Sequence, residues 1–395
     1  MKKHAARIGA CAVLLSSFVS FSHAQRPITP DSPVPDTRKD YAGDDACRSC
    51  HAEKFASFAH TAHHLTSRPA NAESIAGSFA SGSNILKTQN PDLFFEMSSK
   101  PDGFFQTAVT GSGRETTTRT ERMDIVIGSG RKGQTYLYWH NDALFELPVS
   151  YWTALGEWVN SPGYADGFAD FSRPIVPRCL ECHATYFEPV GVQSGNRYRK
   201  ANFVLGITCE KCHGPAREHV ARFSSKSVSP PSDPAIVNPR KLSRDRQMDV
   251  CALCHGGVGE ELAPAFSFVP GEPLAKDLAL PQFEPNAHID VHGSQIELLK
   301  RSRCYQKSDM TCNTCHDVHV TQRDAASFSG RCLACHQVQS CGLYPKLGQQ
   351  IASNCVDCHM PKQQTELIVS SANGKSVRPE VRNHWIKIYP VANKP

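Results

Sequence analysis

Apolar and polar residues alternate most regularly between residues 75 and 155, which is the pattern of half-buried β-strands. Lys100-Pro101-Asp102-Gly103 and His140-Asn141-Asp142-Ala143 are turn sequences within this stretch. Each turn separates two segments of alternating character: Leu93–Met97 from Phe104–Val109, and Thr135–Trp139 from Leu144–Val149. The pattern therefore predicts antiparallel hairpins and a β-rich region.

The N-terminus has the pattern of a secretory signal peptide. Basic residues at positions 2, 3 and 7 precede an apolar run from Ile8 to Phe21, and Ser22-His23-Ala24 offers a cleavage site before Gln25. The run of about 14 residues is shorter than the about 20 residues needed to span a membrane. We therefore expect a mature chain without a transmembrane segment, located in the periplasm or secreted.

The dominant chemical feature is the pattern C-x-x-C-H, which occurs seven times. We number the copies motif 1 to motif 7 in chain order. Their paired thiols are Cys47 and Cys50, Cys179 and Cys182, Cys209 and Cys212, Cys251 and Cys254, Cys312 and Cys315, Cys332 and Cys335, and Cys355 and Cys358. The histidines that close them are His51, His183, His213, His255, His316, His336 and His359.

Each motif is the attachment signature of haem c. The two thiols form thioethers with the porphyrin vinyl groups, and the adjacent histidine binds the iron from one side. The sequence thus predicts seven covalently attached haems c, each with an iron bound by the histidine of its motif. Haem attachment outside the cytoplasm agrees with an exported chain.

Other uses of cysteine fit the pattern less well. Structural zinc uses such pairs two at a time, and it gives no reason for a histidine after every pair. Thioredoxin-like redox pairs need a βαβ context that does not surround these motifs. A disulfide scaffold explains the number of cysteines but not the placement of the histidines.

The net charge of +5 includes three basic residues of the predicted signal peptide, so the mature polypeptide carries about +2. Each haem adds two propionates, and the basic residues are scattered along the chain. The charge therefore favours neutralisation of haem over nucleic-acid binding. The expected partners are other redox proteins.

A second axial ligand on each iron sets its potential and reactivity. Nine histidines remain outside the motifs and the signal peptide. His319 follows His316 by three residues, so both lie on one helical face and cannot bracket one iron. His319 is therefore predicted to bind a neighbouring haem, and the same argument applies to His219 after His213. His140 falls in a predicted turn, where an exposed structural role is favoured over iron binding. The sequence does not decide whether His60, His64 or His288 is a distal ligand.

Apart from Cys11 in the predicted signal peptide, two cysteines, Cys304 and Cys341, are left over after haem attachment. Spare thiols often pair in an oxidising compartment, so we predict a disulfide between them. The alternative is a thiolate ligand on one iron.

The residues around several motifs resemble cytochrome c-552/4 domains, which are related to the tetrahaem cytochrome that accepts electrons from hydroxylamine oxidoreductase. The resemblance begins at motif 1 with Phe58, Thr61 and His63. It continues in Ile207–Pro215 with His219, in motif 5 with Asp317-Val318-His319, which is similar to the doubled C-x-x-C-H module, and in Cys355–Pro361.

This resemblance implies periplasmic electron transfer by haems that mostly have two histidine ligands, some stacked in close pairs. It supports His63, His292 and His384 as further distal ligands. The chain has three motifs more than the tetrahaem member.

We therefore predict a multihaem cytochrome c of mainly short α-helices and irregular wrapping around haems, with an inserted antiparallel β subdomain. The expected division is 1–24 signal peptide, 25–40 Pro-rich leader, 41–70 first haem segment including a helix over Ala52–Leu65, 71–165 β-rich insertion without a haem motif, 166–260 three motifs, 261–300 irregular linker, 301–365 three motifs, and 366–395 C-terminal tail.

The function that this pattern favours is an exported heptahaem cytochrome that relays single electrons in a periplasmic redox chain, without enzymatic activity. The alternative is a reductase or oxidoreductase that acts on nitrite, hydroxylamine or a sulfur oxyanion at one haem with an open coordination position.

Overall fold

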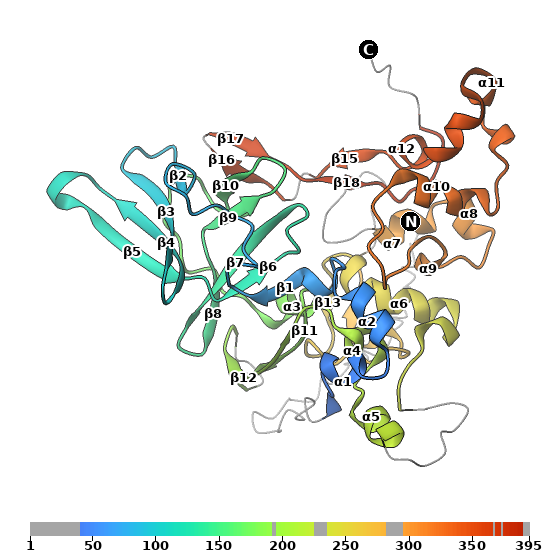
Figure 1. Cartoon of the computed structure of the whole chain (residues 1–395), viewed down its shortest axis with the longest axis horizontal. Helices are drawn as coiled ribbons and strands as arrows, with labels where there is room; N and C mark the ends of the chain where they lie inside the picture. The colour runs from blue at the N-terminus through green and yellow to red at the C-terminus, as the bar shows by residue number, and fades with distance from the viewer. Residues whose placement is uncertain are drawn as a thin grey trace, which may run out of the picture. The chain divides into compact units, whose positions relative to one another are not determined.

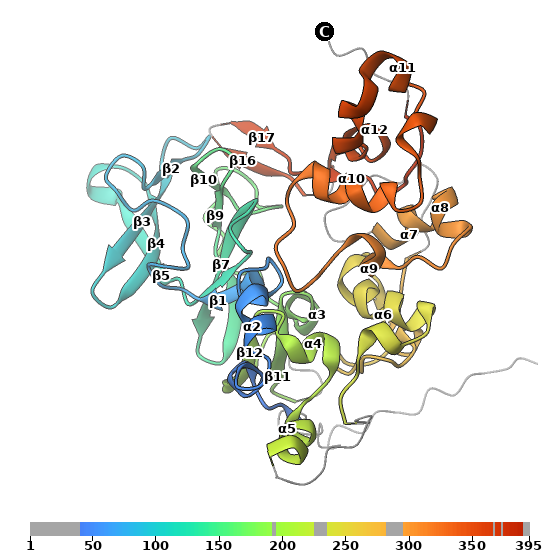
Figure 2. The same cartoon turned by 45° about the vertical axis from the view of Figure 1, so that its right-hand side comes forward.

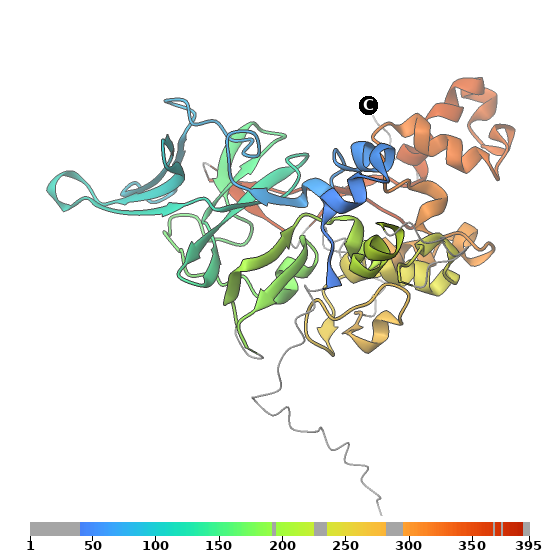
Figure 3. The same cartoon turned by 60° about the horizontal axis from the view of Figure 1, so that its bottom comes forward.

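The computed structural model describes residues 40–191, 195–224, 235–281, 295–365, 368–372 and 374–389. The predicted signal peptide, almost all of the Pro-rich leader, and His288 and His292 lie outside the described residues. Figures 1 to 3 show the arrangement of the elements from three directions. Within the described residues, no helix has the length and apolar character needed to cross a membrane.

The α-helices are short. They are α1 (Asp44–Arg48), α2 (Ala52–Phe58), α3 (Pro177–Glu181), α4 (Cys209–His213), α5 (Arg217–Ser224), α6 (Arg244–His255), α7 (Gln295–Lys300), α8 (Arg303–Gln306), α9 (Cys312–Cys315), α10 (Ala325–Leu333), α11 (Tyr344–Leu347) and α12 (Val356–His359).

The strands gather mainly between residues 67 and 205. They are β1 (Ser67–Pro69), β2 (Ile85–Lys87), β3 (Leu93–Lys100), β4 (Gly103–Thr110), β5 (Thr117–Arg122), β6 (Ile125–Ile127), β7 (Gly133–His140), β8 (Ala143–Glu146), β9 (Val149–Trp152), β10 (Glu157–Asn160), β11 (Ala184–Pro189), β12 (Tyr198–Leu205), β13 (Glu260–Glu261), β14 (Leu278–Ala279), β15 (Lys362–Gln364), β16 (Ser370–Ala372), β17 (Lys375–Val377) and β18 (Glu380–Arg382).

Two antiparallel sheets form the β region. One has the order β2-β3-β4-β5, and the other has the order β1-β6-β7-β9-β10 with β8 paired to β7. The predicted hairpin β3–β4 is confirmed: Lys100 pairs with Gly103, so that Pro101 and Asp102 form the turn. The hairpin β7–β8 is confirmed as well, with Asn141 at φ 54° in its turn.

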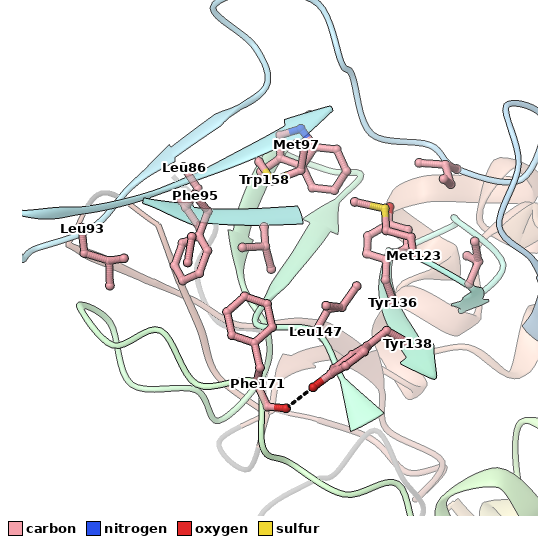
Figure 4. Close-up of a cluster of buried hydrophobic side chains, with 14 residues drawn as sticks. Leu86, Leu93, Phe95, Met97, Met123, Tyr136, Tyr138, Leu147, Trp158 and Phe171 are labelled. Atoms are coloured by element: carbon pink, nitrogen blue, oxygen red, sulfur yellow. Dashed lines mark hydrogen bonds between the residues drawn. The ribbon is translucent and has the colours of Figure 1, made fainter. Parts of the chain in front are cut away.

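The buried faces of these two sheets meet in one hydrophobic cluster (Figure 4). Leu93, Phe95 and Met97 alternate inward along β3, as a period of two requires. The buried side chain of Gln106 on β4 donates to the carbonyl oxygen of Val149 on β9 at 2.7 Å, and its own oxygen accepts from Val149 N–H at 3.1 Å. This pair of hydrogen bonds joins one sheet to the other.

The C-terminal segment returns to this β region. Strand β15 (Lys362–Gln364) pairs with β18 (Glu380–Arg382), and β16 (Ser370–Ala372) pairs with β17 (Lys375–Val377), both antiparallel. Strand β16 lies against β10 (Figures 1 and 2), where Asn160 donates to Ser371 Oγ at 2.9 Å. The end of β18 then leads directly to His384.

Three sequence expectations need correction. The predicted helix over Ala52–Leu65 ends at Phe58, where the hydroxyl of Thr61 donates to the Phe58 carbonyl at 2.7 Å and competes with helical bonding. Leu144–Val149 is not one strand, because Pro148 interrupts it between β8 and β9. The hairpin β11–β12 lies inside the predicted second haem segment, where strands were not expected.

Candidate functional site

Every motif begins on a short helix or contains one. Helix α4 consists of motif 3 alone; it begins at Cys209 and stops at Gly214, whose φ of 82° ends the helix. Helix α6 ends with motif 4 and is capped by Ser243, whose side chain accepts from Arg246 N–H. Both cysteines of motifs 3, 4 and 5 lie within one helix, and because residues three apart lie on one helical face, their two thiols share a face.

The structure places four motif histidines opposite four other histidines. The ring centres lie 6.5 Å apart for His51 and His219, 6.2 Å for His213 and His319, 6.1 Å for His255 and His63, and 6.2 Å for His316 and His384. The four partners are predicted distal ligands: His63, His219, His319 and His384. The fifth predicted distal ligand, His292, lies outside the described residues.

This spacing fits an iron between the rings. A metal–imidazole nitrogen bond is about 2.0 Å long. A five-membered ring with bonds near the about 1.33 Å of a C–N bond has each atom about 1.1 Å from its centre. Two imidazoles on opposite sides of one iron therefore have centres about 6.2 Å apart. All four observed pairs lie within a few tenths of an ångström of this value.

Three of these rings, and the ring of His359 in motif 7, have their Nδ1 atoms close to acceptor oxygens of the protein. Nδ1 lies 2.8 Å from the Val237 carbonyl oxygen in His213, 3.1 Å from the Arg382 carbonyl oxygen in His384, and 2.9 Å from the Lys387 carbonyl oxygen in His359. In His319, Nδ1 lies 3.5 Å from the Asp317 carboxylate. Such contacts fix the tautomer in which Nε2 is the metal-binding atom.

His64 is arranged differently from its neighbour His63. Its Nε2 lies 3.0 Å from the Asp44 carboxylate, so this nitrogen is already used. His60 and His140 are exposed. The structure therefore selects His63 from the cluster of three histidines that follows motif 1.

The environment favours the neutral form of five of the paired rings, which is the form that binds metals. Desolvation by the surrounding protein lowers the pKa of His255 to about 4, although the residue as a whole is exposed. Burial also lowers the pKa of His384 to about 4. The same cause lowers the pKa of His63, His213 and His316.

The eight rings form two groups of four. One group contains the pairs of motifs 1 and 3, and His51 and His319 both act electrostatically on His213. The other contains the pairs of motifs 4 and 5, because His63, His316 and His384 all act on His255. Each group would hold two neighbouring haems.

Thiols of different motifs also adjoin. The ligand atoms of Asp44, Cys47 and Cys209 lie within 4.8 Å of one another, which places motif 1 beside motif 3. Cys251 and Cys312 pack against one hydrophobic cluster and share a hydrogen bond, which joins motifs 4 and 5.

Motif 2 lies beside motif 4. Cys182 Sγ contacts the Leu253 carbonyl oxygen at 3.8 Å, and a hydrogen bond with Cys254 lowers the pKa of Cys182 to about 7. Motifs 6 and 7 adjoin as well, because Ser329 of α10, which carries Cys332, accepts from Cys355 N–H at 2.8 Å. Since the thioethers of haem c form at the porphyrin edge, adjoining thiols bring porphyrin edges together.

The remaining predicted residues have less defined surroundings. His183 Nδ1 lies 3.1 Å from Thr66 Oγ1, and His336 is exposed. Cys304 and Cys341 are free thiols, as are the motif cysteines between residues 47 and 358. Cys304 acts electrostatically on Cys315 and Cys332, so it lies among the thiols of motifs 5 and 6. Its pairing with Cys341 stays a prediction.

Sequence reasoning missed one residue that organises the site. Glu210, inside motif 3, is 1% exposed. Its carboxylate accepts from the N–H groups of Ala42 at 2.7 Å, Gly43 at 2.9 Å and Ala216 at 2.9 Å. These bonds attach the start of α1, with motif 1, and the approach to α5, with His219, to α4. The sequence carries no spacing that would single it out.

Comparisons with known proteins find similarity to multihaem cytochromes. The model of the cytochrome c554 and c-prime family matches residues 168–214, which hold motifs 2 and 3. The chain is 28% identical over 208 residues to the multiheme cytochrome MtrA of Shewanella baltica (strain OS185), a match that covers 50% of this chain and 49% of that protein.

It is 24% identical over 229 residues to the C-type polyheme cytochrome OmcC of Geobacter sulfurreducens, covering 49% of this chain and 27% of that protein. The chain thus spans half or less of these two relatives. The crystal structure of the outer cell wall cytochrome OcwA has a similar fold, with a TM-score of 0.53 and 16% identity over 88% of this chain and 80% of that one.

Proposed function

We propose that the chain is a multihaem c-type cytochrome with covalently bound haem c, and that it relays single electrons through seven haems, one on each motif. The observation that carries this proposal is the set of four histidine pairs at 6.1–6.5 Å. An iron with imidazole on both sides has no free position for a substrate, but it can still change its charge by one electron.

The chain's own residues would arrange these sites as a connected path. Motif 1 adjoins motif 3, Cys212 of motif 3 acts electrostatically on Cys251 of motif 4, and motif 4 adjoins motif 5. Cys315 of motif 5 acts on Cys332 of motif 6, which adjoins motif 7. The proposed order is therefore motifs 1, 3, 4, 5, 6 and 7, with motif 2 as a side branch at motif 4.

The mature protein would work in the periplasm or outside the cell, after removal of residues 1–24, and would exchange electrons with other redox proteins. The pattern of the first residues supports this location. The structural neighbour OcwA is an outer cell wall cytochrome, which agrees with a role outside the cytoplasm. The β region without haem motifs would shield haem edges or offer a docking face.

Haem counting tests the proposal. The purified protein should have the mass of its polypeptide plus seven haems, and a reductive titration should take up seven electrons per molecule. Replacing Cys332 and Cys335 together by serine should remove one haem, whereas Cys304→Ser, which changes a cysteine outside the motifs, should leave the number unchanged. A wild-type count other than seven would contradict the proposal.

Spectroscopy of the oxidised protein separates the relay from the enzymatic alternative. A relay with two strong ligands on every iron shows low-spin iron only. A high-spin iron that binds nitrite or hydroxylamine in the intact protein would support the reductase instead. In the same sample, alkylation without reductant should leave Cys304 and Cys341 unmodified if they form the predicted disulfide.

A further inference from the structure

We infer that His63 and His255 bind one iron with crossed ring planes, and that this ligation makes the haem of motif 4 the one that is reduced first among the four paired haems. The inference rests on the proposed relay. The planes of His63 and His255 are inclined at 76°, whereas the planes of the other pairs are inclined at 15°, 25° and 32°. Motif 4 is therefore the exception in this set.

Backbone hydrogen bonds fix the position of His63. Its carbonyl oxygen accepts from Ile207 N–H at 3.0 Å and from Thr66 N–H at 3.2 Å. Next to it, Gly206 approaches so closely that an added Cβ would lie 2.4 Å from the His64 carbonyl oxygen. The first haem segment is thus held against the strand that precedes motif 3, which fixes the backbone of His63.

His255 is fixed from the other side. It is the last residue of α6, whose buried residues Met248 and Leu253 pack in a hydrophobic cluster with Ile296 of α7. The direction of helix α6 determines where the His255 side chain leaves the backbone, and a segment distant in sequence does the same for His63. The crossed arrangement is consequently a property of the tertiary structure.

The angle between the ligand planes changes the electronic state of an iron. Two parallel imidazoles donate π density to the same iron d orbital, which raises that orbital and stabilises the hole of the oxidised state. Two crossed imidazoles donate equally to both orbitals of the pair, so this stabilisation is lost. The oxidised state is then less favoured, and the reduction potential is higher than that of an otherwise similar site with parallel rings.

The position of motif 4 gives this difference a role. Its thiols adjoin Cys182 of motif 2 and Cys312 of motif 5, so it lies where the proposed side branch joins the path. A site of higher potential at a junction retains an electron that arrives from either direction. The structure thus assigns motif 4 as the point where electrons collect before they move on.

Simple ring packing is the competing explanation, because aromatic rings also meet edge to face at centre distances of about 4.5–7 Å. The two explanations differ in what they predict for iron. Packing alone leaves the ring angle without effect on any spectrum, whereas ligation gives the crossed pair its own electron paramagnetic resonance signal. That signal has one strongly shifted component at high g, while near-parallel pairs give three resolved components.

The experiment uses the oxidised, fully loaded protein and three variants. His63→Ala should lose the crossed-type signal and gain a high-spin signal, with the haem count by mass unchanged. His219→Ala should lose a near-parallel signal and keep the crossed-type signal. His60→Gln alters an exposed histidine of the same segment and should leave the spectrum as in the wild type.

Survival of the crossed-type signal in His63→Ala, or its loss in His219→Ala, would overturn the inference. If His63→Ala does not yield a stable protein, a potentiometric titration of the wild type decides. The crossed-type signal should then disappear before the near-parallel signals, and disappearance after them would overturn the inference. A wild type with seven haems but no crossed-type signal refutes this inference alone, whereas a wrong haem count refutes the relay.

Discussion

The buried carboxylate of Glu210 should be among the largest single contributions to the stability of the haem-binding part of the chain. It accepts three backbone N–H groups, from Ala42, Gly43 and Ala216, and is 1% exposed. Glu210→Ala leaves all three donors without an acceptor. Each hydrogen bond to a charged group contributes about 1.5–3 kcal/mol.

The three contributions do not simply add, because the variant also removes the cost of burying a charge. We therefore expect Glu210→Ala to lower the free energy of unfolding by about 3–5 kcal/mol. Glu210→Gln should cost about 1–3 kcal/mol. Its single oxygen can replace Oε1, which serves Ala42 and Ala216, but its NH₂ group then faces the N–H of Gly43.

Guanidinium unfolding of the loaded protein, followed by the Soret band and by far-UV circular dichroism, measures these differences. Glu218→Ala is the matched control, because Glu218 is 71% exposed and pairs with Arg222 on the surface of α5. It should change stability by no more than about 0.5 kcal/mol. The reasoning fails if Glu210→Ala is no more damaging than this control. Equal losses in Glu210→Ala and Glu210→Gln would show that charge, not the acceptor geometry, is what matters.

Three further predictions concern the same free energy of unfolding. Gly206→Ala should cost more than about 2 kcal/mol, because φ is 71° and the new Cβ would lie 2.4 Å from the His64 carbonyl oxygen. The control Gly82→Ala, with φ 85° and open space around it, should cost about 1 kcal/mol. Equal losses in the two variants would refute the role of the contact. Phe95→Ala, at 0% exposure, should cost about 3–5 kcal/mol, and Phe168→Ala, at 66% exposure, less than about 0.5 kcal/mol, so similar values would contradict the described core. Ser243→Ala should cost about 1 kcal/mol by removing the cap of α6, with Ser243→Asp retaining the cap; amide exchange at Arg246 reports the loss, and unchanged exchange would argue against the cap.

Local patterns allowed much of the β region to be predicted. The alternation of Leu93, Phe95 and Met97, and the turn at Pro101-Asp102, depend only on neighbours in sequence, and the structure follows them. The prediction of one strand over Leu144–Val149 overlooked Pro148, which lacks the N–H that a strand pairing through that residue would need. The strands β11 and β12 were not predicted, because the segment that contains them was assigned to short helices and irregular wrapping on the basis of its three haem motifs.

The motifs themselves could be read directly, but the partner of each motif histidine could not. His319 and His219 were expected to serve neighbouring haems because of their distance along a helix, and the structure brings them to His213 and His51. The helical premise itself is wrong, because α9 ends at Cys315 and Gly214 ends α4 before His219. Nothing in the sequence indicates that His63 faces His255, since 191 residues of intervening chain must fold before the two rings meet. Likewise, Glu210 is ordinary in sequence and becomes decisive only where three separate segments meet.

The exchange of histidines between distant segments also restricts how such a chain can change during evolution. His63, near the start, and His384, near the end, both reach the ring group of motifs 4 and 5. A deletion from either terminus would therefore damage the same centre. Related proteins that gain or lose haems would do so at motifs whose iron needs no histidine from a distant segment. Recombination between related genes would be tolerated least in the middle of the sequence, because it would separate such partners.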